Sequence, residues 1–306
     1  MRVALALAAF TLHCGCDRPA ATSPPAPAGG APPAPDLVYE RTVGDNLDLY
    51  LASGAGGVER RLTRDPAYDA LPRWTPDGRA LIFSSMRSGN WQLWEMAAEG
   101  GEPRRLRVNG HTEYQADPSP DGARLAFLSD AEGRECLWVM EKGSGASRLL
   151  VRHGKRSILG NPHWSPDGGR IVFSSNWRIG HQIYVLDLAT GDQLRVSSIT
   201  SGGCEPRFRR DGRRVAYVNR GHLGGERSTL VEHDLATGEE KVLVAWPALN
   251  YDPVYSPAGD EIAFASDIGG EYAIYRQRLS DGKSWRVTFG PGPARHPDYR
   301  PRSASR

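Results

Sequence analysis

The feature of this sequence that most constrains its fold is a motif that returns along almost the whole chain. The eight residues Leu71–Gly78, LPRWTPDG, recur as Asn161–Gly168, NPHWSPDG, and weaker copies lie between and after them. The second proline of the motif, or its equivalent, falls at Pro76, Pro120, Pro166, Arg210, Pro257 and Pro301, at intervals of 44, 46, 44, 47 and 44 residues. A period of this size is typical of repeat architectures, so it decides the fold class first.

One copy of the repeat predicts four short strands. Leu71–Trp74 is the first strand, and Thr75–Gly78 is a turn in which proline presets φ and glycine accepts a positive φ. Ala80–Ser84, Trp91–Met96 and Pro103–Leu106 follow as three further strands, separated by glycine-containing loops. Four antiparallel strands in about 44 residues make one blade of a β-propeller.

The two ends of the chain predict a shared blade. His296–Pro301 has the pattern of a first strand, whereas Asp36–Glu40, Leu47–Leu51 and Arg60–Thr63 have the patterns of a second, third and fourth strand. The expected fold is therefore all-β, a six-bladed propeller of four-stranded antiparallel blades over residues 37–301, with residues 302–306 as a tail. Joining the termini in one blade removes two open sheet edges.

The consensus P-x-[WF]-S-P-D-G, followed by an Ile-x-Phe-x-Ser strand, resembles the TolB-like propeller repeat, a PD40 or WD40-like repeat. The resemblance covers residues 37–301 and implies a bacterial cell-envelope propeller that binds a protein. TolB itself is periplasmic and carries a separate N-terminal α/β domain. We expect no such domain here, so contacts made by that domain are not carried over.

The N-terminal residues resemble a bacterial lipoprotein signal. Met1-Arg2 gives a positive start, and Val3–Leu12 is an apolar run too short to span a bilayer stably. Cys16 follows a glycine and is the expected lipidation site, with Cys14 as the other candidate. Ordinary cleavage near Ala20, or a retained anchor, are the alternatives.

A tether is expected to separate this signal from the propeller. Residues 17–36 are rich in proline and alanine and show no hydrophobic periodicity. The predicted organisation is a signal over residues 1–16, a linker over 17–36 and the propeller. The predicted location is the periplasm or cell envelope, with a membrane contact through the lipid anchor.

Charge and cysteine content exclude several classes of function. Lys and Arg number 38 against 36 Asp and Glu, a net charge of +2, so no nucleic-acid partner is expected. The arginine-rich stretch Arg207–Arg214 is interpreted as a solvated hairpin at a turn of the repeat. Cys136 and Cys204 fall in different blades and are expected to be isolated thiols rather than a disulfide.

Aligned copies of the motif identify the residues that should surround the axis of the propeller. The residue before the first proline of each copy is, in turn, Leu71, Gln115, Asn161, Glu205, Asp252 and His296. The residues one position earlier are Ala70, Tyr114, Gly160, Cys204, Tyr251 and Arg295. Because equivalent positions converge at the channel rim, the predicted binding residues are Gln115, Asn161, Glu205, Asp252, Arg295 and His296.

Three of these residues predict a polar cluster. Glu205, Asp252 and His296 are neighbours around the ring and together suit a cation, a peptide terminus or a sugar. A divalent metal on these three side chains is one alternative, and an ordinary water-lined channel is the other.

The sequence favours binding over catalysis. No G-x-S-x-G motif is present, so the hydrolases that carry related propellers are not matched. Related propellers in oligogalacturonate lyases use a His-rich channel with a metal, whereas His296 is the one histidine of this ring. We expect a non-enzymatic, monomeric scaffold for an envelope protein or peptide, with no catalytic residue and no cofactor. The alternative is a metal-assisted polysaccharide lyase or hydrolase that uses the same cluster.

The remaining repeat positions are expected to serve the fold. Inter-blade core is expected at Trp74, Trp164, Phe208 and Tyr255, and turn roles are expected at Asp77, Asp121, Asp167 and Asp211. His163 alternates away from Asn161 and is expected to pack within or beneath its own blade.

Overall fold

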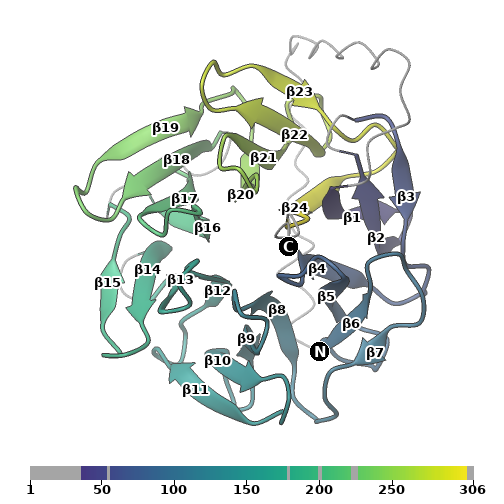
Figure 1. Cartoon of the computed structure of the whole chain (residues 1–306), viewed down its shortest axis with the longest axis vertical. Helices are drawn as coiled ribbons and strands as arrows, with labels where there is room; N and C mark the ends of the chain where they lie inside the picture. The colour runs from purple at the N-terminus through teal and green to yellow at the C-terminus, as the bar shows by residue number, and fades with distance from the viewer. Residues whose placement is uncertain (1–35, 54–55, 178–179, 199–201, 222–226, 302–306) are drawn as a thin grey trace.

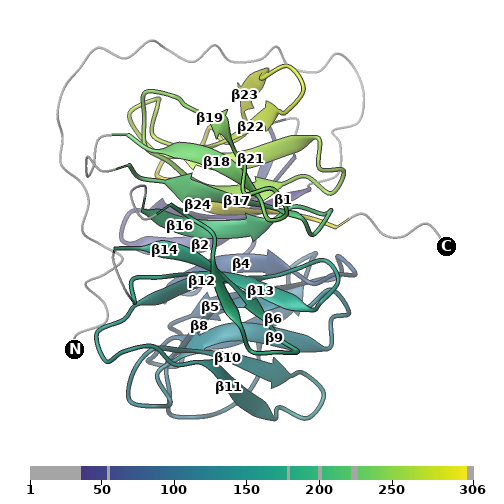
Figure 2. The same cartoon turned by 90° about the vertical axis from the view of Figure 1, so that its left-hand side faces the viewer.

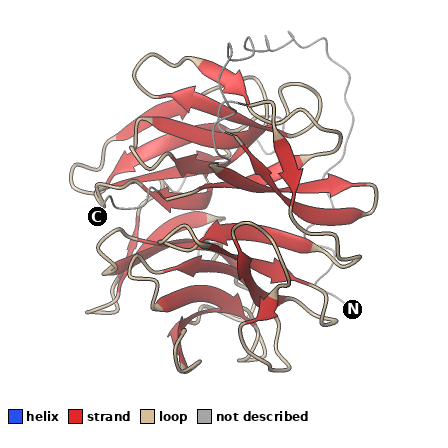
Figure 3. Ribbon diagram, turned by 45° about the vertical axis from the view of Figure 1, so that its right-hand side comes forward, coloured by secondary structure: helices blue, strands red, loops and turns tan. Residues whose placement is uncertain are grey.

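The structure is a computed structural model that describes residues 36–53, 56–177, 180–198, 202–221 and 227–301. Its strands form six four-stranded antiparallel sheets arranged around a common axis (Figure 1). The side view shows the sheets stacked as the blades of a propeller (Figure 2). Within these ranges the chain consists of strands and turns (Figure 3), and no helix is long and apolar enough to cross a membrane.

Each blade is built from consecutive strands, except the one that holds both ends of the propeller. We call β4–β7 blade 1, β8–β11 blade 2, β12–β15 blade 3, β16–β19 blade 4 and β20–β23 blade 5. The composite blade has the order β24-β1-β2-β3.

The innermost strands begin each blade next to the axis. They are β4 (Asp69–Trp74), β8 (Glu113–Pro118), β12 (Leu159–Trp164), β16 (Gly203–Phe208), β20 (Asn250–Tyr255) and β24 (Ala294–Tyr299). The second strands are β1 (Leu37–Val43), β5 (Ala80–Ser85), β9 (Arg124–Ser129), β13 (Arg170–Ser175), β17 (Arg214–Asn219) and β21 (Glu261–Ser266).

The third and fourth strands lie progressively farther from the axis. The third strands are β2 (Asn46–Ala52), β6 (Gln92–Ala97), β10 (Cys136–Glu141), β14 (Gln182–Asp187), β18 (Thr229–Asp234) and β22 (Ala273–Arg278). The outer strands are β3 (Glu59–Arg61), β7 (Arg104–Arg105), β11 (Ser147–Val151), β15 (Gln193–Arg195), β19 (Glu240–Val244) and β23 (Ser284–Arg286).

The composite blade closes the ring as the sequence predicted. The C-terminal strand β24 pairs with β1, with Leu37 opposite Tyr299 and Val38 opposite Asp298. The amide of Arg300 also donates to the carbonyl of Asp36 at 2.7 Å. These bonds satisfy edges of β24 and β1 that would otherwise be open to other chains.

The turn that recurs in each copy of the repeat has the hydrogen bonds and the positive glycine φ expected of it. The Asp77 carboxylate accepts from the Thr75 hydroxyl at 2.6 Å and from the Arg79 amide at 3.1 Å, while Gly78 has a φ of 66°. Equivalent bonds from a backbone amide two residues on occur at Asp121, Asp167 and Asp211. The turn role predicted for these aspartates is confirmed.

Aromatic residues of the motif fill the spaces between blades. Trp74 is buried with Val38 and Leu49 of the composite blade, and its indole N–H donates to the Asp298 carbonyl at 3.2 Å. Trp164, Phe208 and Tyr255 lie in the corresponding inter-blade clusters. Burial of such rings supplies much of the hydrophobic stabilisation, and the indole N–H is satisfied as well.

The interpretation of Arg207–Arg214 as a solvated hairpin is wrong for its first residue. Arg207 is buried, and its guanidinium donates to the Pro206 carbonyl at 3.0 Å, whereas Arg210 and Arg213 are exposed. The side chain of Arg207 belongs to the innermost strand β16 and precedes the turn. Arg207 is therefore buried because it lies in the innermost strand, and its charge is not the reason for its burial.

Cys136 in β10 and Cys204 in β16 are free thiols, as predicted. The signal of residues 1–16, most of the 17–36 linker and the 302–306 tail lie outside the described residues. Lipidation at Cys16, with Cys14 as its alternative, stays a prediction.

Candidate functional site

Each innermost strand carries one residue in the left-handed region at the place that the repeat alignment singled out. These residues have φ between 51° and 56° and are Leu71, Gln115, Asn161, Glu205, Asp252 and His296, which we call the inner ring. At each of them the strand pairing shifts, so that two residues oppose one on the second strand. A left-handed residue other than glycine costs roughly 1–2 kcal/mol, so six of them need support from their surroundings.

The support comes from hydrogen bonds that join one blade to the next. The Asn161 amide donates to Gln115 Oε1 at 2.7 Å, and the Asp252 amide donates to Glu205 Oε2 at 2.6 Å. The His296 amide donates to Asp252 Oδ2 at 3.1 Å. Inner-ring side chains therefore hold the bulge of the following blade, which gives them a structural task beside any binding.

The Leu71 amide is accepted not by an inner-ring side chain but by a residue that the sequence reasoning missed. Glu40 of β1 is buried and accepts the Leu71 amide at 2.7 Å through Oε2. Its Oε1 lies 2.8 Å from His296 Nδ1. Glu40 thus links the composite blade to blade 1 and extends the polar cluster of the inner ring.

The predicted neighbours Glu205 and Asp252 meet around an arginine. Arg295 Nε lies 2.5 Å from Asp252 Oδ2, and its Nη2 lies 3.5 Å from Glu205 Oε1. The guanidinium carbon is 4.9 Å from the ring centre of Tyr251 and 4.8 Å from that of Tyr272. We call Glu40, Glu205, Asp252, Arg295 and His296 the ion cluster. Its arginine is held both by charge and by two aromatic faces.

Glu205 and Asp252, two carboxylates of the ion cluster, have opposite pKa shifts. Burial and the nearby Asp252 charge raise the pKa of Glu205 to about 7, against the opposing charge of Arg295. Burial also opposes ionisation of Asp252, but Arg295 and His296 outweigh it and hold the pKa of Asp252 well below its usual range. Glu205 is therefore the group of this pair that takes up a proton near neutral pH.

The carboxylates around His296 favour its charged form. Burial favours the neutral ring, but Asp252 and Glu40 outweigh it and raise the pKa of His296. Nδ1 faces Glu40, and Nε2 lies 3.2 Å from Asp252 Oδ1. With both nitrogens directed at carboxylates, the imidazolium is a double donor rather than a base.

The sequence also raised the alternative that Glu205, Asp252 and His296 bind a divalent metal, and their arrangement does not fit a metal site. Glu205, Asp252 and His296 offer one ligand atom each within 4.8 Å of one another. A histidine ligand must be neutral with a free lone pair, whereas both nitrogens of His296 face carboxylates. The guanidinium of Arg295 also already contacts both carboxylates.

Comparison with known proteins decides the family. The family model described as the TolB beta propeller domain, PD40, matches residues 22–155, 115–247 and 151–305. The chain belongs to the TolB β-propeller domain family. The resemblance inferred from the repeated P-x-[WF]-S-P-D-G motif is confirmed.

Individual relatives of this TolB-family propeller agree in fold but are distant or short in alignment. "Tol-Pal system protein TolB" of Bordetella pertussis is 52% identical over 42 residues, which is 13% of this chain and 10% of that protein. The crystal structure of TolB from Acinetobacter baumannii has a TM-score of 0.76 at 19% identity, over 89% of this chain and 68% of that one. An oligogalacturonate lyase in complex with manganese has a TM-score of 0.58 at 17% identity, over 79% of this chain and 71% of that one. At these identities the solved structures show the fold alone.

The TolB-family propeller carries a second set of ionisable residues that the sequence reasoning did not group. Two positions after the inner ring stand Arg73, Asp117, His163, Arg207 and Asp298, which we call the second ring. Burial raises the pKa of Asp117 to about 7 and that of Asp298 to about 6, in both cases against the charge of Arg73. Burial lowers the pKa of His163 to about 4, with Arg73 and Asp298 also acting on it. Arg73 Nε lies 3.6 Å from Asp117 Oδ1, although the two residues come from different blades.

The second ring also ties neighbouring blades together. Asp117 Oδ2 accepts the Trp164 amide at 2.8 Å, and His163 Nδ1 accepts the Phe208 amide at 3.2 Å. His163 therefore does not pack only within or beneath its own blade, as expected, but bonds to the blade that follows. The same alignment of motif copies that identified the inner ring would have identified these residues, since they stand two positions after it.

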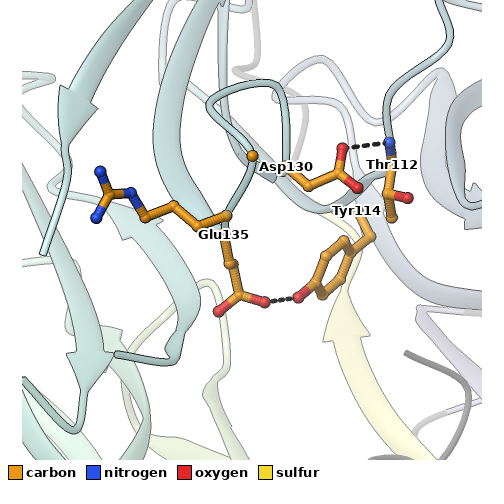
Figure 4. Close-up of a pocket in the computed structure, with 6 residues that line it drawn as sticks. Thr112, Tyr114, Asp130 and Glu135 are labelled. Atoms are coloured by element: carbon orange, nitrogen blue, oxygen red, sulfur yellow. Dashed lines mark hydrogen bonds between the residues drawn. The ribbon is translucent and has the colours of Figure 1, made fainter. Parts of the chain in front are cut away.

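A separate cavity of about 300 Å³ opens beside blade 2. It is lined by Thr112, Tyr114, Asp130, Gly133, Arg134 and Glu135. Tyr114 and Glu135 point toward each other, and the Asp130 carboxylate accepts the Thr112 amide at 2.8 Å (Figure 4). Sequence reasoning placed Tyr114 one position before the inner ring but did not identify its partner in the loop before β10.

Proposed function

We propose that this TolB-family propeller is an exported, non-enzymatic scaffold that binds an envelope protein or peptide at its inner ring. Residues 1–16 would direct export, lipidated Cys16 would attach the chain to a membrane, and residues 17–36 would tether the propeller of residues 37–301. The 302–306 tail has no assigned part. The printed name of the Bordetella relative, a Tol-Pal system protein, supports an envelope protein as the partner class.

The observation that carries this proposal is the position of Arg295. Its guanidinium lies against Asp252, near Glu205 and beside two tyrosine rings that contact each other. An arginine fixed in this way presents a rigid, partly exposed donor with tyrosine faces beside it. Tyrosine and arginine are the residue types enriched where protein partners make their strongest contacts.

The ion cluster also lacks the groups that hydrolysis or elimination needs. A general base must be able to accept a proton from the substrate. Both nitrogens of His296 face carboxylates that raise its pKa, and Asp252 is engaged by Arg295. Glu205 has a suitable pKa, but its Oε2 already accepts the Asp252 amide. This arrangement favours recognition over catalysis.

The proposal is tested by capture of envelope proteins on the immobilised mature chain. Glu205→Gln keeps an acceptor for the Asp252 amide but removes the charge, and we expect it to weaken capture at the inner ring. The matched control is Glu239→Gln in the exposed β18–β19 hairpin, which should capture as much as the wild type. Equal capture by all three chains would refute binding at the inner ring.

A lyase is the second candidate, because a manganese-bound oligogalacturonate lyase shares the fold, although the contacts of Arg295 and His296 with the carboxylates do not suit Glu205, Asp252 and His296 to hold a metal. The test is incubation with acidic polysaccharide and Mn²⁺, with absorbance of unsaturated product as the readout. We expect no product. Product formation that is lost in His296→Ala would establish the lyase and overturn the binding-only proposal.

A further inference from the structure

The cavity beside blade 2 lies outside the ion cluster and has its own chemistry. Its volume of about 300 Å³ is far above the roughly 30 Å³ that one water occupies in the liquid. Two carboxylates, a phenol, a hydroxyl and a guanidinium line it (Figure 4). It therefore has both the room and the polar groups to hold the head group of a ligand.

The repeat shows what occupies the corresponding place elsewhere. Tyr114 directly precedes the inner ring in blade 2, as Tyr251 does in blade 5. Glu135 directly precedes β10, as Tyr272 directly precedes β22. In blade 5 the two tyrosine rings lie beside the guanidinium of Arg295, which the following blade supplies. The propeller thus fills this space in blade 5 with an arginine of its own.

Blade 2 has no such arginine, because the blade that follows carries Gly160 at the position of Arg295. Gly160 has no side chain to place beside Tyr114, and a carboxylate, that of Glu135, stands where blade 5 has Tyr272. Within the described ranges no lysine or arginine forms an ion pair with Glu135. Arg134, although adjacent in the chain, directs Nη1 to the His153 carbonyl at 3.5 Å.

The carboxylate of Glu135 also replaces a main-chain bond. Where three other pairs of blades meet, the innermost strand of the next blade donates to a carbonyl: the Glu113 amide to Trp91 at 2.8 Å, the Gly203 amide to His181 at 2.6 Å and the Ala294 amide to Tyr272 at 2.9 Å. Here the Leu159 amide donates to Glu135 Oε1 at 2.7 Å, and the Tyr114 hydroxyl donates to Oε2. Burial raises the pKa of Glu135 to about 7, so a cation in the cavity would favour its charged form.

We propose that the cavity binds the guanidinium of an arginine side chain presented by a peptide, beside Tyr114 as Arg295 lies beside Tyr251 in blade 5. The planar group would stack on Tyr114 and donate to the Glu135 carboxylate, which is the pairing that guanidinium makes best. This site goes beyond the proposed inner-ring function. Glu135 supports none of the inner-ring amides, so a failure here leaves the inner-ring proposal standing.

The test is calorimetric titration of the full chain with a blocked Gly-Arg-Gly peptide and with its citrulline copy. Citrulline keeps the shape of arginine but has no charge. We expect saturable binding of the arginine peptide, with the citrulline peptide about tenfold weaker or more, because a hydrogen bond between charged groups is lost. This comparison uses the wild-type chain and so does not depend on the folding of any variant.

A matched pair of variants places the site. We expect Glu135→Gln to lower affinity for the arginine peptide to that of the citrulline peptide. Glu132→Gln, an exposed acid of the same loop that pairs with Arg152, should bind as the wild type does. Equal affinity for the two peptides, no saturable binding, or undiminished binding by a folded Glu135→Gln chain would each overturn the proposal.

Discussion

Glu40 offers the sharpest test of how the ring is closed. It is 5% exposed, its Oε2 accepts the Leu71 amide at 2.7 Å and its Oε1 lies 2.8 Å from His296 Nδ1. Glu40→Ala removes both bonds. The amide of Leu71, whose φ is left-handed, and the buried Nδ1 of His296 then have no acceptor. A buried polar group left unpaired costs about 1–3 kcal/mol, so we expect the free energy of unfolding to fall by about 2–5 kcal/mol.

The assay is thermal unfolding followed by circular dichroism, with urea unfolding as a second measure. For a chain of this size a loss of 1 kcal/mol lowers Tm by about 2–4 °C, which predicts a fall of about 5–15 °C. Glu40→Gln keeps one acceptor for Leu71 and should lose about half as much. Glu99→Ala, at a side chain that is 79% exposed, should change Tm little. If Glu40→Ala unfolds within about 1 °C of Glu99→Ala, the closure argument is wrong.

Three further predictions concern the second ring, the packing of one strand and the membrane anchor. In the folded protein the pKa of Asp117 is about 7, against an ordinary 3.8, so the fold disfavours the charged carboxylate. In urea unfolding, the wild type should therefore lose stability relative to Asp117→Asn as the pH rises from about 4 to 7. A stability difference that stays constant across that range would contradict the burial of this charge. A methyl group added at Gly203 would lie 2.7 Å from Ile183 Cγ1, so Gly203→Ala should lower the free energy of unfolding by about 1–3 kcal/mol, whereas Gly143→Ala, with nothing within 4 Å, should change it by less than about 0.5 kcal/mol. In membrane fractionation, Cys16→Ser should release the chain while Cys14→Ser should not, and the reverse pattern would move the lipidation site.

The period of the motif was sufficient to predict the blades, the composite blade and the positions of the inner ring. These features follow from local sequence, because each turn and strand repeats with the same residue types. The left-handed φ of Gln115 or Glu205 could not be read from propensity, since neither residue type favours it. Only the alignment with the other copies marked them as equivalent.

Contacts between distant strands were beyond the reach of that reasoning. Glu40 is 256 residues from His296 in the chain, and nothing in its own strand marks it as a partner of the inner ring. Arg295 was predicted at the rim, but its place beside Tyr251 and Tyr272 depends on how two blades pack. The cavity at Glu135 likewise depends on how the contact between blades 2 and 3 differs from the contact between blade 5 and the composite blade, and no motif marks that difference.

The central claim is that a partner docks at the inner ring. It is tested most directly by a photo-crosslinking amino acid placed at Asn161, in cells that express the chain, and by the same amino acid at Thr237 in the exposed hairpin between β18 and β19. We predict a discrete crosslinked protein from position 161 and none from position 237. Crosslinks from position 237 with none from position 161 would contradict the account.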